Sequence, residues 1–341
     1  MNKYKDFFKN IENYESDIVN ELDDKILNNN EISLMSLEER KFVNGIIRKT
    51  KPKKILEVGV ASGAGSMLLL NSIKDTDAKL YSIDYLENWW VDQTKKIGYL
   101  VEENTPNLLS KWKIYRGGVS AKFLEEIGEE IDICMLDTMH ANPGEILDFI
   151  TILPFLKKNG ILIIHDIQLH AGKWKEQFDP TCCNLLSAVR GYTFMPESAY
   201  KVNNCFLNIG AVVLDDNIKE YIDNILLLLT MRWRHRVTPE DHMYISNIIK
   251  KYYPDDIYLK YKEIYNHLNI TEHYLPDIST TLIRLNDNIN QLNNKINILE
   301  NNMNLSNNKF DKFINSIAWW IPIKKLRNNF RNKICRAELT I

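Results

Sequence analysis

The stretch ILEVGVASGAGS, residues 55–66, is the most informative about the fold, because it passes from an apolar run to a glycine-rich turn and then to a helical pattern. An apolar run leads into a turn that contains Gly59, Gly63 and Gly65, and the turn leads into a helical segment near 64–74. Glycine lets a backbone approach a ligand closely, and the start of a helix presents N–H groups that lack partners. The stretch therefore predicts a strand, a ligand-binding turn and a helix.

The rest of the first two-thirds of the chain repeats this alternation of strand and helix. Strands that are apolar throughout, separated by helices, are typical of a parallel sheet covered on both faces. We therefore expect an α/β fold, with a Rossmann-like, doubly wound and mostly parallel sheet of about seven strands. The predicted strands are 54–59, 79–84, 112–116, 131–137, 160–166 and 206–215, and the predicted helices lie near 64–74, 87–101, 119–128 and 143–157.

The sheet is flanked by regions of different composition. Residues 1–50 have apolar side chains at helical spacing and predict an N-terminal cap of two or three helices, ahead of a core at 51–215. Within that core, 167–205 reads as an irregular insertion with Trp174, Phe178 and a helix near 182–190, and it suits the wall of a pocket. Residues 216–278 are again predicted to be helical.

Residues 279–315 predict a coiled coil. Apolar residues repeat in sevens over 282–313, with Ser306 as the one break at position d, which favours a parallel two-stranded coil and hence a homo-oligomer. The segment 286–308 holds 11 asparagines, which are poor helix formers, so a solvated polar tail is the alternative. The repeat places Leu282, Ile289, Ile296, Met303 and Phe310 at position a, and Leu285, Leu292, Leu299 and Phe313 at position d.

The chain ends in a basic, aromatic tail at 316–341. Trp319 and Trp320 lie close to six basic residues, a composition that suits peripheral contact of 316–336 with an anionic membrane surface. The alternative is a helix that docks its tryptophans on the protein itself. The basic residues are Lys324, Lys325, Arg327, Arg331, Lys333 and Arg336.

The composition of the 341 residues limits the class of protein. With 45% hydrophobic and 26% charged residues, the chain reads as a soluble globular protein, and a formal charge of −2 argues against a nucleic-acid binder. No signal peptide is evident, and the longest aliphatic run, 225–229, is too short to span a bilayer. Five scattered cysteines fit reduced thiols, so we expect a cytoplasmic protein, with the tail as a contact to the inner face of the membrane.

Two of the predicted strands end in polar residues, MLDTMH at 135–140 and ILIIHD at 161–166. The carboxyl ends of parallel strands meet at one edge of a sheet, which brings Asp137 and Asp166 to the edge that also holds Gly59 and Asp84. Two close carboxylates repel each other unless a proton or cation intervenes, and Mg²⁺ is the hard divalent cation that such oxygen ligands suit. Such an ion could orient an acceptor hydroxyl, and a nearby imidazole could accept its proton.

The glycine-rich stretch does not match G-x-G-x-x-G, but it resembles motif I of class I S-adenosylmethionine-dependent methyltransferases. The resemblance implies that Asp84 holds the ribose hydroxyls and that Glu57 lies near the methionine end of the cofactor. An acid near the adenine is missing, because Val119 and Ser120 stand at its position. The cofactor contacts implied are Glu57, Gly59, Ser62, Gly63, Gly65, Asp84, Tyr85, Ser120 and Asp137.

Residues 50–215 also resemble metal-dependent bacterial sugar O-methyltransferases of the mycinamicin type and the cephalosporin-hydroxylase-like family, through D-x-x-H followed by the aspartate of an apolar-H-D strand end. This resemblance implies that Asp137 and Asp166 are metal ligands and that His140 is the general base. Glu145, Asp148 or water could supply a third ligand. His165 precedes Asp166 in a strand, so we expect a buried structural histidine that faces the other way, and we assign His170 to the pocket without a role.

The function expected is O-methylation of a sugar in a bacterial surface glycan or secondary metabolite. Two alternatives stay open: a phosphoryl oxygen or amine as the acceptor, and a catalytically silent scaffold that assembles through its coil. A hydroxylase would need a redox metal site, which two carboxylates without a facial histidine pair do not provide.

Overall fold

The computed structural model describes residues 2–23, 35–171, 178–197, 208–269, 278–319 and 324–337. The chain divides into two compact units, 1–274 and 275–341. Of the residues singled out above, Trp174 and Trp320 lie outside the described ranges, as do the first two residues of the strand expected at 206–215.

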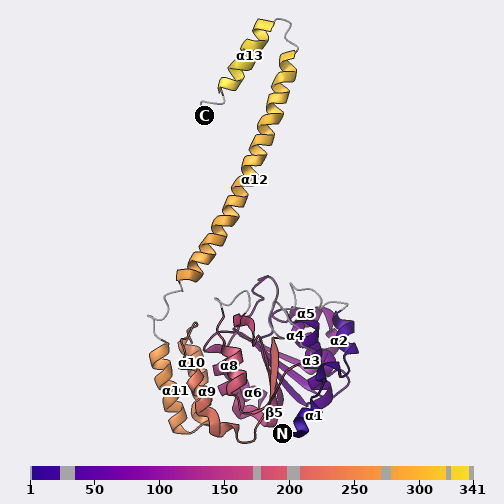
Figure 1. The fold of residues 1–341 in the computed structure, drawn as a ribbon, viewed down its shortest axis with the longest axis vertical. Helices are drawn as coiled ribbons and strands as arrows, with labels where there is room; N and C mark the ends of the chain where they lie inside the picture. The colour runs from indigo at the N-terminus through magenta and orange to yellow at the C-terminus, as the bar shows by residue number, and fades with distance from the viewer. Residues whose placement is uncertain are drawn as a thin grey trace. The chain divides into compact units, whose positions relative to one another are not determined.

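The first unit is built on a mixed sheet that lies between layers of helices (Figure 1). The sheet has seven strands in the order β3-β2-β1-β4-β5-β7-β6. The first five strands along this order are parallel, and β7 runs antiparallel to both β5 and β6, so the expected α/β fold is confirmed. The order reverses at β1, between β2 and β4, and ligands bind beside such a reversal at the carboxyl ends of the strands. The strands are β1 Lys54–Val58, β2 Lys79–Asp84, β3 Trp112–Arg116, β4 Ile131–Leu136, β5 Leu156–His165, β6 Gly191–Phe194 and β7 Ile209–Leu214.

Helices cover both faces of the sheet, and the strand residues alternate between two buried clusters. Ile55 and Ile133 pack with the helices on one face, whereas Leu56 and Cys134 pack with those on the other. This alternation is the period of two that a strand imposes on its side chains. The first face carries α1 Asn2–Phe7, α2 Asp17–Leu22, α3 Leu37–Thr50, α4 Ala64–Ser72 and α5 Tyr99–Asn104; the second carries α6 Leu124–Ile127, α7 Gly144–Ile152, α8 Thr181–Ala188, α9 Ile222–Leu228, α10 Pro239–Tyr252 and α11 Asp255–Leu268.

The helix predicted near 87–101 is wrong over most of its length. The backbone N–H of Ile97 donates to Glu87, and that of Trp89 donates to Lys95, so the segment folds back on itself. Asp92 accepts from the N–H and hydroxyl of Thr94, a side-chain turn that competes with helix formation. Only α5 remains helical, after Gly98 in a left-handed conformation (φ 78°).

Two further boundaries differ from the prediction. Strand β5 begins at Leu156 rather than at 160. Leu156 pairs with Ile131, and the register of the two strands shifts between Ile131 and Ile133. The polar residues 157–159 did not indicate a strand in the sequence. Strand β6 was not predicted; it is short and lies at the edge of the sheet. The helix expected near 182–190 is confirmed as α8.

The second unit consists of helices α12 (Ile278–Trp319) and α13 (Lys324–Ala337). Several residues of the predicted heptad repeat are exposed on α12: Ile289, Leu292, Ile296, Leu299, Phe310 and Phe313. Within the described parts of the chain, no helix has the length and apolar character needed to cross a membrane.

Candidate active site

The glycine-rich turn after β1 lies against the loop that follows β4. A Cβ atom on Gly59, where φ is +93°, would come within 1.8 Å of the backbone oxygen of Asp137. Gly63 has φ +98°, and a Cβ atom on Gly65 would lie 2.8 Å from Glu57 Oε1. Glycine is therefore required here because of the positive φ angles and because a Cβ atom would collide with neighbouring atoms. The backbone of the turn is in direct contact with the backbone of the Asp137 loop.

Asp84, at the end of β2, holds the turn in place. Its Oδ2 accepts hydrogen bonds from the N–H groups of Val60 (2.9 Å) and Ala61 (3.0 Å), and its Oδ1 accepts one from Leu86 (2.9 Å). A carboxylate offers about four acceptor sites, so little capacity remains beyond these three bonds. The structure thus gives Asp84 a role in shaping the turn that the sequence did not indicate.

Glu57 is buried beneath the same turn. Its Oε2 accepts hydrogen bonds from the hydroxyls of Ser66 (2.5 Å) and Ser82 (2.6 Å). Burial raises the pKa of Glu57 to about 7; the two hydroxyls oppose this shift, and the charges of Asp137 and Asp84 add to it.

The remaining residues proposed for the cofactor lie in different surroundings. Ser62 is buried, whereas Tyr85 is 54% exposed and its hydroxyl donates to Asp241 in α10 (3.3 Å). Ser120 donates to Asp148 Oδ1 (2.6 Å), and desolvation raises the pKa of Asp148 to about 7. Asp148 is therefore engaged with Ser120 and is not part of the group around Asp166 that could hold an ion.

The two strand ends do converge. Asp137 follows β4 and Asp166 follows β5, and His140 Nε2 lies 3.0 Å from Asp166 Oδ2 and 3.7 Å from Asp137 Oδ1. One ligand atom from each of these three residues lies within 4.8 Å of the others. We call Asp137, His140, His165 and Asp166 the strand-end cluster.

The expectation that His165 faces away from this cluster is wrong. His165 Nδ1 lies 3.2 Å from Asp137 Oδ1 and 3.5 Å from Asp166 Oδ1. The strand ends at His165 and Asp166 has φ +58°, so the alternation of side chains does not continue and both residues reach the same site. The expected burial of His165 is confirmed, since it is only 2% exposed.

Sequence reasoning missed two partners of this cluster. Glu39 closes a capping box with Ser36 at the start of α3, and its Oε2 also lies 3.7 Å from His165 Nε2. Asn208 donates to Asp166 Oδ1 through its side chain, and its backbone N–H donates to Glu39 Oε1 (2.6 Å). The capping motif can be read from the sequence, but nothing in the motif indicates its second partner.

Charge in the cluster is balanced between histidines and carboxylates. Burial acts to lower the pKa of His140, but the hydrogen bond to Asp166 and the charges of Asp166, Asp137 and Glu145 raise it to about 9. Burial also acts to lower the pKa of His165, but the carboxylates of Asp166 and Asp137 outweigh this effect and raise it. The pKa of Asp166 is lowered by both histidines against the effect of its own burial. At neutral pH these residues form a network of paired charges.

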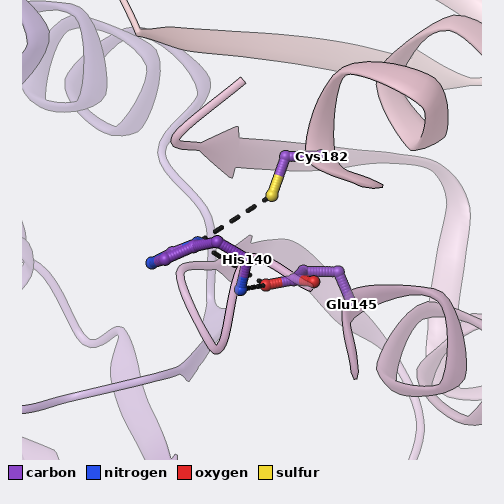
Figure 2. A group of neighbouring side chains, drawn as sticks. All are labelled: His140, Glu145 and Cys182. Carbon is purple, nitrogen blue, oxygen red and sulfur yellow. Dashed lines mark hydrogen bonds and ion pairs between the residues drawn. The ribbon is translucent and has the colours of Figure 1, made fainter. Parts of the chain in front are cut away.

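Glu145 and Cys182 both lie close to the His140 side chain (Figure 2). Glu145 Oε1 accepts from the backbone N–H of His140 and from Thr138 Oγ1 (3.0 Å), and it lies 3.5 Å from His140 Nδ1. Cys182 Sγ is 3.9 Å from the same nitrogen. Glu145 therefore faces Nδ1, not the Asp137–Asp166 pair, and His170 on the short helix Leu169–Ala171 is in neither group.

Comparison with known proteins finds a family match in the middle of this unit. Residues 56–167 match the family model described as a methyltransferase domain, which runs from β1 to just beyond β5. The match includes the glycine-rich turn and the whole strand-end cluster, so this part of the chain is similar to a methyltransferase domain. No curated protein matches the chain.

Several solved structures resemble the chain at low sequence identity. An O-methyltransferase from Bacillus cereus in complex with SAH is 15% identical, with 60% of this chain and 99% of that chain covered and a TM-score of 0.41. An SAH-bound methyltransferase from Podospora anserina, PaMTH1, is 15% identical, with 61% of this chain and 92% of that chain covered and a TM-score of 0.39. The mycinamycin-pathway methyltransferase MycE, in complex with Mg, SAH and mycinamycin VI, is 16% identical, with 58% of this chain and 55% of that chain covered and a TM-score of 0.39. Likeness at this level does not identify a cofactor or an acceptor.

Proposed function

We propose that the chain transfers a methyl group from S-adenosylmethionine to a hydroxyl oxygen of an acceptor, and that the acceptor is a sugar. The observation that carries this proposal is the position of the strand-end cluster: two histidines and two aspartates gather at a loop whose backbone, at Asp137, lies against the glycine-rich turn. A group that accepts a proton and a pair of carboxylates that can hold a cation are what activation of a hydroxyl requires.

The turn fits the proposed cofactor. Gly63 and Gly65 leave room at the start of α4, where a Cβ on either residue would meet neighbouring atoms within 3 Å. The N–H groups there suit a carboxylate such as that of methionine, and Glu57 beneath the turn suits an ammonium group once it is ionised. Asp84 keeps the turn in shape through its three backbone bonds, which leave about one of its four acceptor sites for a hydroxyl of the ribose.

The carboxylates of Asp137 and Asp166 fit a divalent cation of the Mg²⁺ type. They offer hard oxygen ligands, and the Asp137 side chain is 29% exposed, which leaves access for an acceptor and for water. A cation held there would neutralise the carboxylates that keep His140 protonated and would orient a hydroxyl of the acceptor. Glu39 and Asn208 hold His165 and Asp166 in position around it.

His140 is proposed as the proton acceptor, through Nε2. The acceptor oxygen attacks the methyl carbon of the sulfonium, a C–O bond forms as the C–S bond breaks, and the hydroxyl proton passes to Nε2. The products are a methyl ether and S-adenosylhomocysteine. The backbone N–H of His140 is tied to Glu145, which fixes the loop from which the imidazole reaches Asp166.

The second unit supports a proposal about assembly and location. The exposed apolar positions of α12 follow a heptad repeat, so we assign to 282–313 the role of a homo-oligomeric coiled coil. Helix α13 carries exposed Lys324, Lys325 and Lys333, which suits contact with an anionic membrane surface and hence a lipid-linked surface glycan as the acceptor. A soluble secondary metabolite is the other acceptor class.

Titration calorimetry with S-adenosylmethionine, with and without Mg²⁺, tests the proposal. We expect binding of the cofactor and a separate heat for Mg²⁺ that Asp137→Asn or Asp166→Asn removes. Absence of cofactor binding would refute methyl transfer by this chain. Turnover that persists in the presence of a chelator would refute the cation while leaving methyl transfer intact.

A further inference from the structure

We propose that His140, Glu145 and Cys182 form a second cation site that takes a soft divalent ion such as Zn²⁺. This site uses Nδ1 of the imidazole, whereas the strand-end cluster uses Nε2 (Figure 2). It brings together one nitrogen, one carboxylate oxygen and one sulfur, the ligand types that zinc prefers. Mg²⁺ does not favour sulfur, so the two sites select different ions.

The distances between the ligand atoms fit tetrahedral zinc. Zinc bonds of about 2.0–2.3 Å place two ligand atoms of a tetrahedron about 3.4–3.6 Å apart. His140 Nδ1 lies 3.5 Å from Glu145 Oε1 and 3.9 Å from Cys182 Sγ, and all three ligand atoms lie within 4.8 Å of one another. Small side-chain rotations are enough to close these separations, and water or a second oxygen of Glu145 can complete the coordination.

A second observation points to a ligand at this position. The Glu145 side chain is fully buried (0% exposed), and its Oε2 has no hydrogen-bond partner among the residues that the structure describes. A buried carboxylate oxygen without a partner is costly, and a cation beside it removes that cost. Burial raises the pKa of both Glu145 and Cys182, and an ion would offset this by stabilising the anionic forms.

The backbone holds these ligands before any ion binds. Glu145 and Cys182 are the second residues of α7 and α8, where the partial positive charge of a helix N-terminus favours anionic side chains. The carbonyl of His140 accepts a hydrogen bond from the N–H of Asp179 (3.1 Å), just ahead of α8. This bond connects the loop that carries His140 to the segment that leads to Cys182. A preformed arrangement lowers the entropic cost of binding.

An ion at this site would inhibit methyl transfer, and this consequence rests on the function proposed above. A metal on Nδ1 leaves the remaining ring proton on Nε2, which then donates to Asp166. That nitrogen can no longer accept the proton of a hydroxyl. The site would therefore make the activity sensitive to free zinc.

Titration of the full chain with Co²⁺, in a reducing buffer free of thiols, tests for the site without any assay of activity. We expect a thiolate-to-cobalt charge-transfer band that saturates at a single equivalent and disappears when Zn²⁺ displaces the cobalt. Cys182→Ser should abolish the band, whereas Cys183→Ser, at the neighbouring and more exposed thiol, should retain it. A native protein without the band, or a band lost in Cys183→Ser and kept in Cys182→Ser, would overturn the proposal.

Glu145→Gln provides a variant in which the thiol is unchanged. We expect the band to persist while the affinity for Co²⁺ falls at least about tenfold; unchanged affinity would refute the carboxylate as a ligand. Once an acceptor is known, Zn²⁺ should inhibit Cys183→Ser as it does the native enzyme, and should inhibit Cys182→Ser much less. A cobalt band in a protein that fails to bind S-adenosylmethionine would leave the cation site standing and refute the proposed function alone.

Discussion

His140 and Asp166, whose Nε2 and Oδ2 atoms lie 3.0 Å apart, both have left-handed backbone conformations, with φ of 54° and 58°. Neither residue is a glycine, and such conformations cost of order 1–3 kcal/mol each when the surrounding structure imposes them. The two turns direct both side chains, from different strands, to one point at the edge of the sheet. Strain of this kind is concentrated at functional sites, which agrees with the role proposed for the pair.

The first prediction concerns the proton acceptor. His140→Asn keeps a residue that tolerates the left-handed turn but removes the basic nitrogen, so turnover should fall by roughly 100-fold or more. Affinity for S-adenosylmethionine should stay within about twofold of the native value, since His140 touches the acceptor side. A methyl-transfer assay and calorimetry measure the two quantities. His267→Asn, at an exposed histidine of α11, is the matched control, and native-like turnover by His140→Asn would contradict the assignment.

The second prediction concerns the stability of the charge network. Asp166→Asn leaves His140 and His165 without their main carboxylate, and removal of one partner from a mostly buried ion pair should lower the free energy of unfolding by roughly 3 kcal/mol. Urea denaturation at neutral pH measures this. Asp215→Asn breaks the exposed pair with Arg190 and should cost less than about 1 kcal/mol. Equal effects of the two substitutions would mean that the cluster does not stabilise the fold.

The third prediction is a dependence of stability on pH. The pKa of Glu57 is about 7 in the folded protein and has a reference value of 4.5, so between these values the folded state holds a proton that the unfolded chain releases. Stability should therefore fall as the pH rises from 4.5 to 7, by up to roughly 3 kcal/mol from this residue. Glu57→Gln should flatten the profile without abolishing it, because Asp148 shifts in the same direction. Glu126→Gln, an exposed control, should not flatten this fall, because Lys113 lowers the pKa of Glu126, which is the opposite direction.

The fourth prediction tests the turn. In Gly65→Ala the new Cβ would lie 2.8 Å from Glu57 Oε1, a side chain that is buried and held by two serines, so S-adenosylmethionine should bind at least about tenfold more weakly. In Gly118→Ala the nearest atom, at 2.7 Å, belongs to the flexible side chain of Lys122, and affinity should change little. Calorimetry compares the two variants. Equal losses would show that the turn is not the binding site.

The fifth prediction concerns assembly. Deletion of 279–341 removes α12 and α13 but leaves the first compact unit, so cofactor affinity should be unchanged while the molar mass in solution falls to that of a monomer. Sedimentation equilibrium of the two forms measures this. A full-length chain that is already monomeric would refute the coiled coil.

The sequence predicted the sheet well because β1, β2, β4 and β5 are long apolar runs with clear ends. It also placed Asp137 and Asp166 together, since parallel topology brings strand ends to one edge. The predicted direction of the His165 side chain was wrong, because the positive φ of Asp166 could not be inferred from the type of residue at that position. The pairing of Cys182 with His140 joins residues 42 positions apart, and it depends on how α8 packs rather than on any local pattern.

The contact between Gly59 and the backbone oxygen of Asp137 has a practical consequence for anyone who mutates this enzyme. The contact joins main chain to main chain, so a substitution of the Asp137 side chain changes its charge and leaves the connection between turn and loop intact. The charge of the Asp137 side chain can thus be changed without changing the backbone contact with Gly59. A loss of activity in an Asp137 variant can be attributed to the missing carboxylate, whereas a loss in a Gly59 variant reports a displaced main chain.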